Sequence, residues 1–148
     1  MFYFPTYLIM KYIYWTVVVL LATIVLYITR EDPVLTDVKK RYDILLNDLP
    51  TGMEKLKEKT VITGFRERYG EIGYNVNKGN EIGLCLDGDA NEVFHVLIHE
   101  LAHTVTKSYS HNGEFWKNFK ILKEHCIRKG VYQPISTRTN FCGKFIRD

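Results

Sequence analysis

Residues 93–105 read VFHVLIHELAHTV, a stretch that combines an apolar period with two histidines and a glutamate. Its apolar residues recur at helical spacing, so we expect a helix over residues 91–107 with one buried face. The same stretch contains His99, Glu100 and His103 in the order H-E-x-x-H. On a helix, this order places the two imidazoles one turn apart on one face. The pattern therefore predicts a metal site on a core helix.

Imidazole nitrogens at this spacing can bind one Zn²⁺ ion, which takes three protein ligands and one open position in catalytic sites. We expect His99 and His103 to hold a single zinc ion. Glu100 is offset around the helix, and we expect it to act as general base on a water molecule that the zinc activates. The opposing interpretation is a pair of structural histidines, but chance produces the pattern in only about one in a hundred chains of this size.

The residues alone leave two candidates for the third ligand. His111 follows His103 by eight residues and falls in an expected turn, where the chain can fold back over the metal. Glu124 follows His103 by 21 residues, a separation typical of the glutamate ligand in thermolysin-like enzymes. We expect His95 to lie in the core beside the ligands, and His125 to lie at the surface or near a helix C-terminus, where a cation is favourable.

Residues 12–29 form an uncharged run of 18 residues, YIYWTVVVLLATIVLYIT. As a helix the run is about 27 Å long, close to the hydrocarbon thickness of a bilayer. A single segment in lipid can pair all of its backbone groups only as a helix. Because no small-x-small cleavage site follows, we expect an uncleaved single-pass anchor over residues 1–30 and a catalytic domain over residues 31–148.

Flanking charges and cysteine usage both favour a cytoplasmic domain. Arg30, Lys39, Lys40 and Arg41 follow the apolar run, whereas only Lys11 and the terminal amine precede it, and positive residues tend to stay in the cytoplasm. The three cysteines are odd in number and form no C-x-x-C, so we expect no disulfide framework and a reducing compartment. Whether the membrane is viral or belongs to a host is left open.

The charge balance bears on the partners of the domain. Residues 30–148 hold 19 of the 20 basic side chains and all 17 acidic ones, a net charge of +2. A charge this small does not support direct nucleic-acid binding. The expected partners are therefore a protein or peptide substrate and the lipid bilayer around residues 12–29.

The rest of the domain mixes helices with short strands. Residues 35–49 and 112–129 have helical apolar spacing. A hairpin turn at residues 77–80 joins the last two of three strand-like runs, which lie at residues 61–62, 72–74 and 82–86. Beyond residue 131 we expect an irregular tail or one short strand. The predicted fold class is α+β, with a short antiparallel sheet packed on the H-E-x-x-H helix.

Three blocks of the domain resemble the WLM-type zinc peptidases, which are relatives of the SprT-like family. YNVNKGNEIGLCL at residues 74–86 is similar to their N-x-N-x-G-x-x-I-x-L-x-L strand pair. LIHELAH at residues 97–103 looks like their zinc helix, and HNGEFW at residues 111–116 looks like their third-ligand turn and the start of the next helix. The resemblance covers roughly residues 70–125.

The resemblance implies a compact, zincin-like α+β metallopeptidase domain. It implies that His99, His103 and His111 hold zinc and that Glu100 is the general base. The turn before His111 is two residues longer than is typical of this family, so the loop must bulge. The family's best-known activity is proteolysis of proteins crosslinked to DNA. The membrane anchor, and the lack of a visible DNA-binding extension, favour membrane-proximal protein substrates instead.

We expect the substrate to lie along the strand that precedes the zinc helix. In many zinc peptidases an edge strand in that position pairs with the extended substrate. Ile82, Gly83 and Leu84 are therefore predicted to contact the peptide. The sequence does not identify the residue that stabilises the oxyanion; the candidates are Tyr109, Tyr132 and Arg138.

Two other functions fit parts of the sequence. Peptide deformylases also use H-E-x-x-H with a cysteine as third ligand, and Cys85 lies upstream, although its separation from His99 is short. A non-catalytic, membrane-anchored zinc-binding scaffold would use the histidines as well, but a purely structural site has no need of Glu100 as a base.

Overall fold

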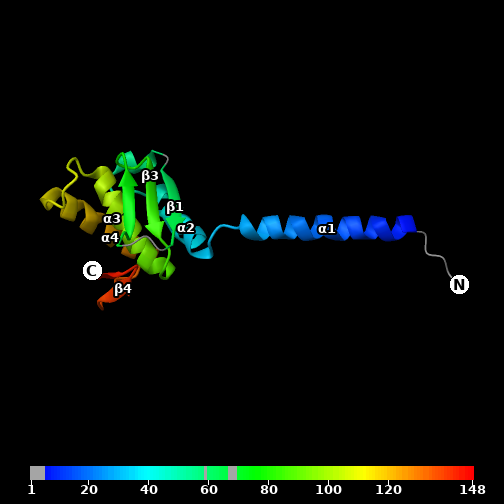
Figure 1. Ribbon diagram of the computed structural model, residues 1–148. Coiled ribbons are helices and arrows are strands. Elements are labelled where there is room, and N and C mark those ends of the chain that lie inside the picture. The colour runs from blue at the N-terminus through cyan, green and yellow to red at the C-terminus, as the bar shows by residue number, and fades with distance from the viewer. Residues whose placement is uncertain (1–5, 59, 67–69) are drawn as a thin grey trace. The chain divides into compact units, whose positions relative to one another are not determined.

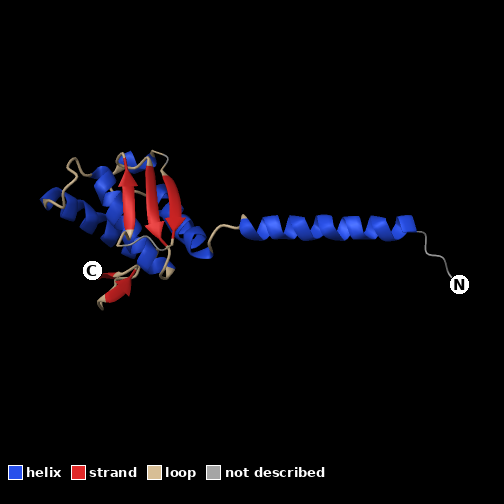
Figure 2. Cartoon of the chain, viewed as in Figure 1, coloured by secondary structure: helices blue, strands red, loops and turns tan. Residues whose placement is uncertain are grey.

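A computed structural model describes residues 6–58, 60–66 and 70–148 of the chain (Figures 1 and 2). The chain divides into two compact units, Met1–Glu31 and Asp32–Asp148. Helix α1, Thr6–Ile28, belongs to the first unit, and none of its residues is buried. It is long and apolar enough to cross a membrane, a property that it shares with signal sequences. This finding agrees with the predicted apolar helix.

The described residues of the second unit form three α-helices, α2 (Pro33–Asn47), α3 (Ala90–Val105) and α4 (Gly113–Arg128), and the short 3-10 helix η1 (Glu54–Lys57). The start of α3 is fixed by a capping box. The Asp89 carboxylate accepts hydrogen bonds from the backbone N–H groups of Asn91 and Glu92, while the Glu92 carboxylate accepts one from Asp89 N. This pairing satisfies backbone donors that a helix start otherwise leaves open. The sequence had predicted all three α-helices within a few residues.

Three strands form a mixed sheet: β1 (Val61–Phe65), β2 (Gly73–Val76) and β3 (Glu81–Cys85). Their order is β1-β3-β2, with β1 parallel and β2 antiparallel to β3. The domain is α+β as predicted, but the prediction of an antiparallel sheet was wrong for the β1–β3 pair. Since β1 precedes β2 in the chain yet pairs with β3, local hairpin signals could not show its direction.

The sheet order also corrects the predicted substrate strand. Ile82, Gly83 and Leu84 lie in the central strand, where each pairs with a residue of β1 and a residue of β2. All three residues are buried. Their backbone groups are therefore already engaged in the sheet, and they cannot pair with a peptide.

The C-terminal tail contains two strands rather than the single one allowed for by the sequence. β4 (Thr139–Phe141) and β5 (Lys144–Ile146) pair as a small antiparallel hairpin. A disulfide joins Cys142, in the hairpin turn, to Cys85 at the end of β3, across 57 residues of sequence. The expectation of no disulfide was therefore wrong, and only Cys126 is free and buried. An odd cysteine count could not reveal a pair that the fold brings together.

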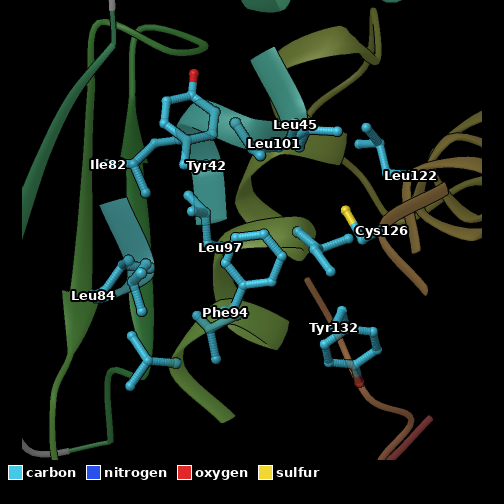
Figure 3. Packing of buried hydrophobic residues seen from close by; sticks show 14 of the residues in the cluster. Tyr42, Leu45, Ile82, Leu84, Phe94, Leu97, Leu101, Leu122, Cys126 and Tyr132 are labelled. Carbon is cyan, nitrogen blue, oxygen red and sulfur yellow. The ribbon is translucent and has the colours of Figure 1, made fainter. Parts of the chain in front are cut away.

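The core lies in layers around α3, which packs against α2, α4, β2 and β3. Figure 3 shows side chains of the sheet on one side, those of α3 next to them and those of α4 beyond. The residues that it labels in these layers are buried: Ile82 and Leu84 of β3, Phe94, Leu97 and Leu101 of α3, and Leu122 and Cys126 of α4. The metal-motif helix is thus the central element of the domain.

Gly83 allows the sheet to pack closely, which yields a test of the fold. A Cβ atom at Gly83 would lie 2.1 Å from Cε1 of Tyr74. The Tyr74 ring cannot move aside easily, because it stacks on Phe65 at 5.8 Å and donates a hydrogen bond to Glu81 at 2.9 Å. We expect Gly83→Ala to lower the free energy of unfolding by roughly 1–3 kcal/mol, measured by urea denaturation of the full chain in detergent.

Gly113→Ala is the matched control for this substitution. A Cβ atom at Gly113 would meet nothing within 4 Å. The change at this site should alter the free energy of unfolding by no more than about 0.5 kcal/mol. Equal stabilities of the two variants would contradict the tight packing of Gly83.

Candidate metal centre

Three histidines converge beside helix α3. His99 and His103 lie on α3, and His111 lies in the loop between α3 and α4. Nε2 of His111 is 3.0 Å from Nε2 of His99 and 3.0 Å from Nε2 of His103. Three nitrogens bound tetrahedrally to one zinc ion at 2.0–2.1 Å would lie about 3.3 Å apart. The structure therefore brings the predicted ligands into an arrangement that fits one ion.

Glu100 lies beside these histidines but faces the sheet. Its side chain is buried, with only 7% of the residue exposed. A Cβ atom at Gly73 in β2 would lie 3.3 Å from Oε1 of Glu100, so the absence of a side chain at Gly73 leaves room for the carboxylate. Glu100 is thus held between the helix and β2, next to the converging nitrogens.

These groups line one cleft of about 420 Å³, together with residues that the sequence analysis did not assign to the metal site. β2 contributes Gly73 and Asn75, the turn after it contributes Lys78, and the C-terminal hairpin contributes Lys144. Motif spacing could not find them, because each reaches the cleft only through the packing of the sheet or hairpin.

A family model described as the WLM domain matches residues 55–143, more than half of the chain. The chain belongs to the WLM-domain family. This metalloprotease-like family supports the general prediction of a metal-dependent peptidase. No curated protein and no solved structure matches the chain. The closer relation to the SprT-like family stays a prediction.

Burial favours the neutral form of the two site histidines that lie on α3. Burial, with smaller contributions from the neighbouring His103, His111 and His95, lowers the pKa of His99 to about 3. Burial also lowers the pKa of His103, again with contributions from His111 and from the Lys78 ammonium. A neutral imidazole presents the free lone pair that a metal ion needs. Near pH 7 His99 and His103 are therefore in the neutral form that binds a metal ion.

Burial acts in the opposite direction on Glu100. It raises the pKa of the Glu100 carboxyl to about 7, because the charged form is poorly solvated between α3 and the sheet. A carboxylate with such a pKa is a stronger base than an exposed one and can exchange protons near neutral pH. This property suits the predicted role of Glu100.

Phe115 forms an apolar floor under the three imidazoles. Its ring centroid is 4.9 Å from that of His99, 4.4 Å from that of His103 and 4.6 Å from that of His111. Phe115 itself is fully buried near the start of α4, whose N-cap is Asn112. The apolar spacing of residues 112–129 predicted this helix, but it could not predict that Phe115 contacts all three rings.

Other candidate residues lie away from the cleft. Glu124 is exposed and lies 3.9 Å from Lys120, so the structure brings His111, not Glu124, to the ligand cluster. Cys85 is disulfide-bonded, which removes it as the third ligand of a deformylase-like site. His125 lies in the last turn of α4, one of its two expected positions, but it is buried and not at the surface, and its Nε2 donates a hydrogen bond to Asp48 O at 2.6 Å.

The three residues predicted as candidates for stabilising the oxyanion differ in whether they lie in the cleft. Tyr109 lines the cleft and is 79% exposed. Tyr132 is buried and donates to Asp148 at 2.7 Å, while His95, a core residue as expected, lies 2.9 Å from the Tyr132 hydroxyl. Arg138 stacks on Phe145. Of the three candidate oxyanion residues, only Tyr109 is therefore near the metal centre.

Proposed function

We propose that this WLM protein is a zinc-dependent endopeptidase that hydrolyses peptide bonds of proteins near a membrane. The observation that carries the proposal is the meeting of three imidazole nitrogens, a buried carboxylate and the strand β2 in one cleft. Imidazole ligands suit zinc, and a site with three of them leaves one position open. The open position and the adjacent base are what amide hydrolysis requires.

Each residue has a separate role in this mechanism. His99, His103 and His111 would hold the ion. When bound, zinc polarises the scissile carbonyl and lowers the pKa of a water molecule. Glu100 accepts a proton from the attacking water and then donates it to the leaving amine, because a pKa near neutrality suits both steps. Contact with Phe115 keeps the imidazoles oriented.

Replacing Glu100 by glutamine separates catalysis from metal binding. The amide keeps nearly the same size but cannot accept the proton, so Glu100→Gln should retain zinc and lose at least about 100-fold in peptide cleavage. The comparison uses both proteins loaded with zinc, with casein and mixed peptides as substrates. His99→Ala, which should lose both zinc and cleavage, is the control.

The same measurement addresses the non-catalytic scaffold. If zinc-loaded wild type and Glu100→Gln bound equal zinc and both cleaved nothing, the scaffold would be favoured over the peptidase. Equal cleavage by both proteins would instead remove Glu100 as the base.

We propose that the substrate pairs with β2 instead of β3. β2 is at the end of the sheet order, so one of its sides has no strand partner among the described residues. The carbonyl of Ile72 accepts a hydrogen bond from Cys85 N, and by antiparallel alternation the backbone groups of Gly73 and Asn75 point to the open side. These two residues line the cleft beside Glu100. An extended peptide added there would pass the metal centre.

Backbone methylation of the substrate tests this pairing. In a cleavable peptide, N-methylation of an amide that bonds to β2 should raise KM several-fold, while methylation of the next amide should have little effect, because alternate amides face opposite sides. A methylation scan of KM along one peptide checks this expectation. A scan without alternation would contradict strand addition.

We propose that α1 anchors the protein in a lipid bilayer and that the peptidase domain faces an oxidising compartment. The apolar length of α1 supports the anchor. The Cys85–Cys142 disulfide argues against the reducing compartment predicted from cysteine usage, since such bonds persist mainly outside the cytosol. The flanking charges favour the opposite orientation, but orientation by charge is only a statistical tendency.

An engineered glycosylation site tests the orientation. Thr137→Asn creates the acceptor Asn-Arg-Thr at an exposed position, in a chain that has no natural acceptor. In eukaryotic cells we expect this variant to gain a glycan that shifts its gel mobility, whereas Thr137→Gln should not shift. An unglycosylated variant whose Cys85 and Cys142 react with a maleimide would place the domain in the cytoplasm.

A further inference from the structure

Lys78 holds the loop that carries His111. This lysine lies in the turn between β2 and β3, and its side chain reaches the loop that follows α3. Its ammonium donates hydrogen bonds to three consecutive backbone carbonyls, those of Thr106, Lys107 at 2.7 Å and Ser108 at 2.9 Å. The ring of Tyr109 covers the same ammonium at 4.3 Å. The Lys78 side chain thus contacts four consecutive residues, 106–109, shortly before His111.

The contacts of Lys78 leave no N–H group for a substrate. A lysine ammonium has three donors, and each here has a backbone acceptor. Lys78 lines the metal cleft, yet this geometry does not suit a residue that stabilises a reacting oxygen. Its contacts instead suit a residue that orders the backbone. The carbonyls at the end of a helix and just beyond it also attract a cation.

The turn that carries Lys78 is itself tied to the zinc helix. Asn75 accepts a hydrogen bond from Gly79 N at 2.7 Å and donates to Glu100 O at 2.7 Å and Thr104 Oγ1 at 2.9 Å. Lys78 has a positive φ of 53°, between two other residues with positive φ. These hydrogen bonds fix the position of the turn relative to the ligands on α3. The contacts of Lys78 in turn fix the loop relative to the turn.

The loop needs such support because His111 is its only residue in the ligand cluster. A loop without regular structure loses conformational entropy when it is held in one shape, and that loss opposes metal binding. We infer that Lys78 is a positioning residue that increases zinc affinity by holding His111 beside His99 and His103. This inference rests on the proposed metal site and adds one residue to it.

Lys55 provides a matched control within the chain. Its ammonium also bonds to a backbone carbonyl near the end of α3, that of Thr104, at 3.0 Å. Unlike Lys78, Lys55 makes no hydrogen bond to the loop that leads to His111. Removing either ammonium takes a cation from the same helix end. Only removal of Lys78 should affect the third ligand.

The experiment measures zinc affinity rather than cleavage. Full-length wild type, Lys78→Met, Lys55→Met, His111→Ala and the Lys78→Met/His111→Ala double variant are titrated in detergent against a chromogenic zinc chelator. Methionine retains an unbranched stem and removes the ammonium. We expect Lys78→Met to weaken zinc binding about 10–100-fold, the range seen when groups that orient metal ligands are removed. Lys55→Met should change it less than about threefold on the same basis.

The double variant shows whether Lys78 acts through His111. If it does, Lys78→Met causes no further loss of affinity once His111 is alanine. The visible absorption of bound Co²⁺ gives a second readout, in which Lys78→Met should shift the spectrum toward that of His111→Ala. Should Lys78→Met not fold, Lys78→Gln, which retains two donors, should give an intermediate affinity.

The possible results separate this inference from the proposed function. Wild-type affinity in Lys78→Met, or an equal loss on the His111→Ala background, overturns the role of Lys78 and leaves the metal site in place. Wild-type affinity in His111→Ala overturns the three-histidine site and the role of Lys78 together.

Discussion

The whole site depends on three imidazoles whose Nε2 atoms converge on one place. Such an arrangement is unfavourable without an ion, because the nitrogens at 3.0 Å cannot all share protons well. It persists only if the surroundings hold each ring. The buried ring of Phe115 supports all three from one side, and burial keeps His99 and His103 uncharged. A bound metal ion would accept a lone pair from each of the three nitrogens and so remove the unfavourable contact between them.

Helix α3 both forms the centre of the core and carries part of the metal centre. One of its faces packs into the centre of the core through Phe94, Leu97 and Leu101 (Figure 3). Another face carries two ligands and the candidate base. Because the helix is packed against both neighbouring helices and the sheet, the ligands on it have little freedom to move. The rigidity that the core requires is therefore also what the metal centre requires.

The loop ligand has a different kind of support. His111 lies outside regular structure, and its position depends on contacts from elements distant in sequence. The β2–β3 turn reaches it through Lys78, and the same strand β2 borders the cleft and covers Glu100. The hairpin thus connects the third ligand, the base and the open strand edge. The C-terminal hairpin, which the disulfide ties to β3, adds Lys144 to the lining of the cleft.

Sequence alone determined the elements whose signals are local. The spacing of His99, Glu100 and His103, the apolar period of the helices and the long uncharged run are all readable from neighbouring residues, and the structure has the corresponding helices. Tertiary structure decided what depends on distant pairing. It placed β1 beside β3, made the predicted substrate strand central, joined Cys85 to Cys142 and brought Lys78 to the loop before His111. The physical reason is that helix periodicity is imposed by hydrogen bonds four residues apart, whereas strand order, disulfides and loop contacts join groups whose proximity arises only when the core packs.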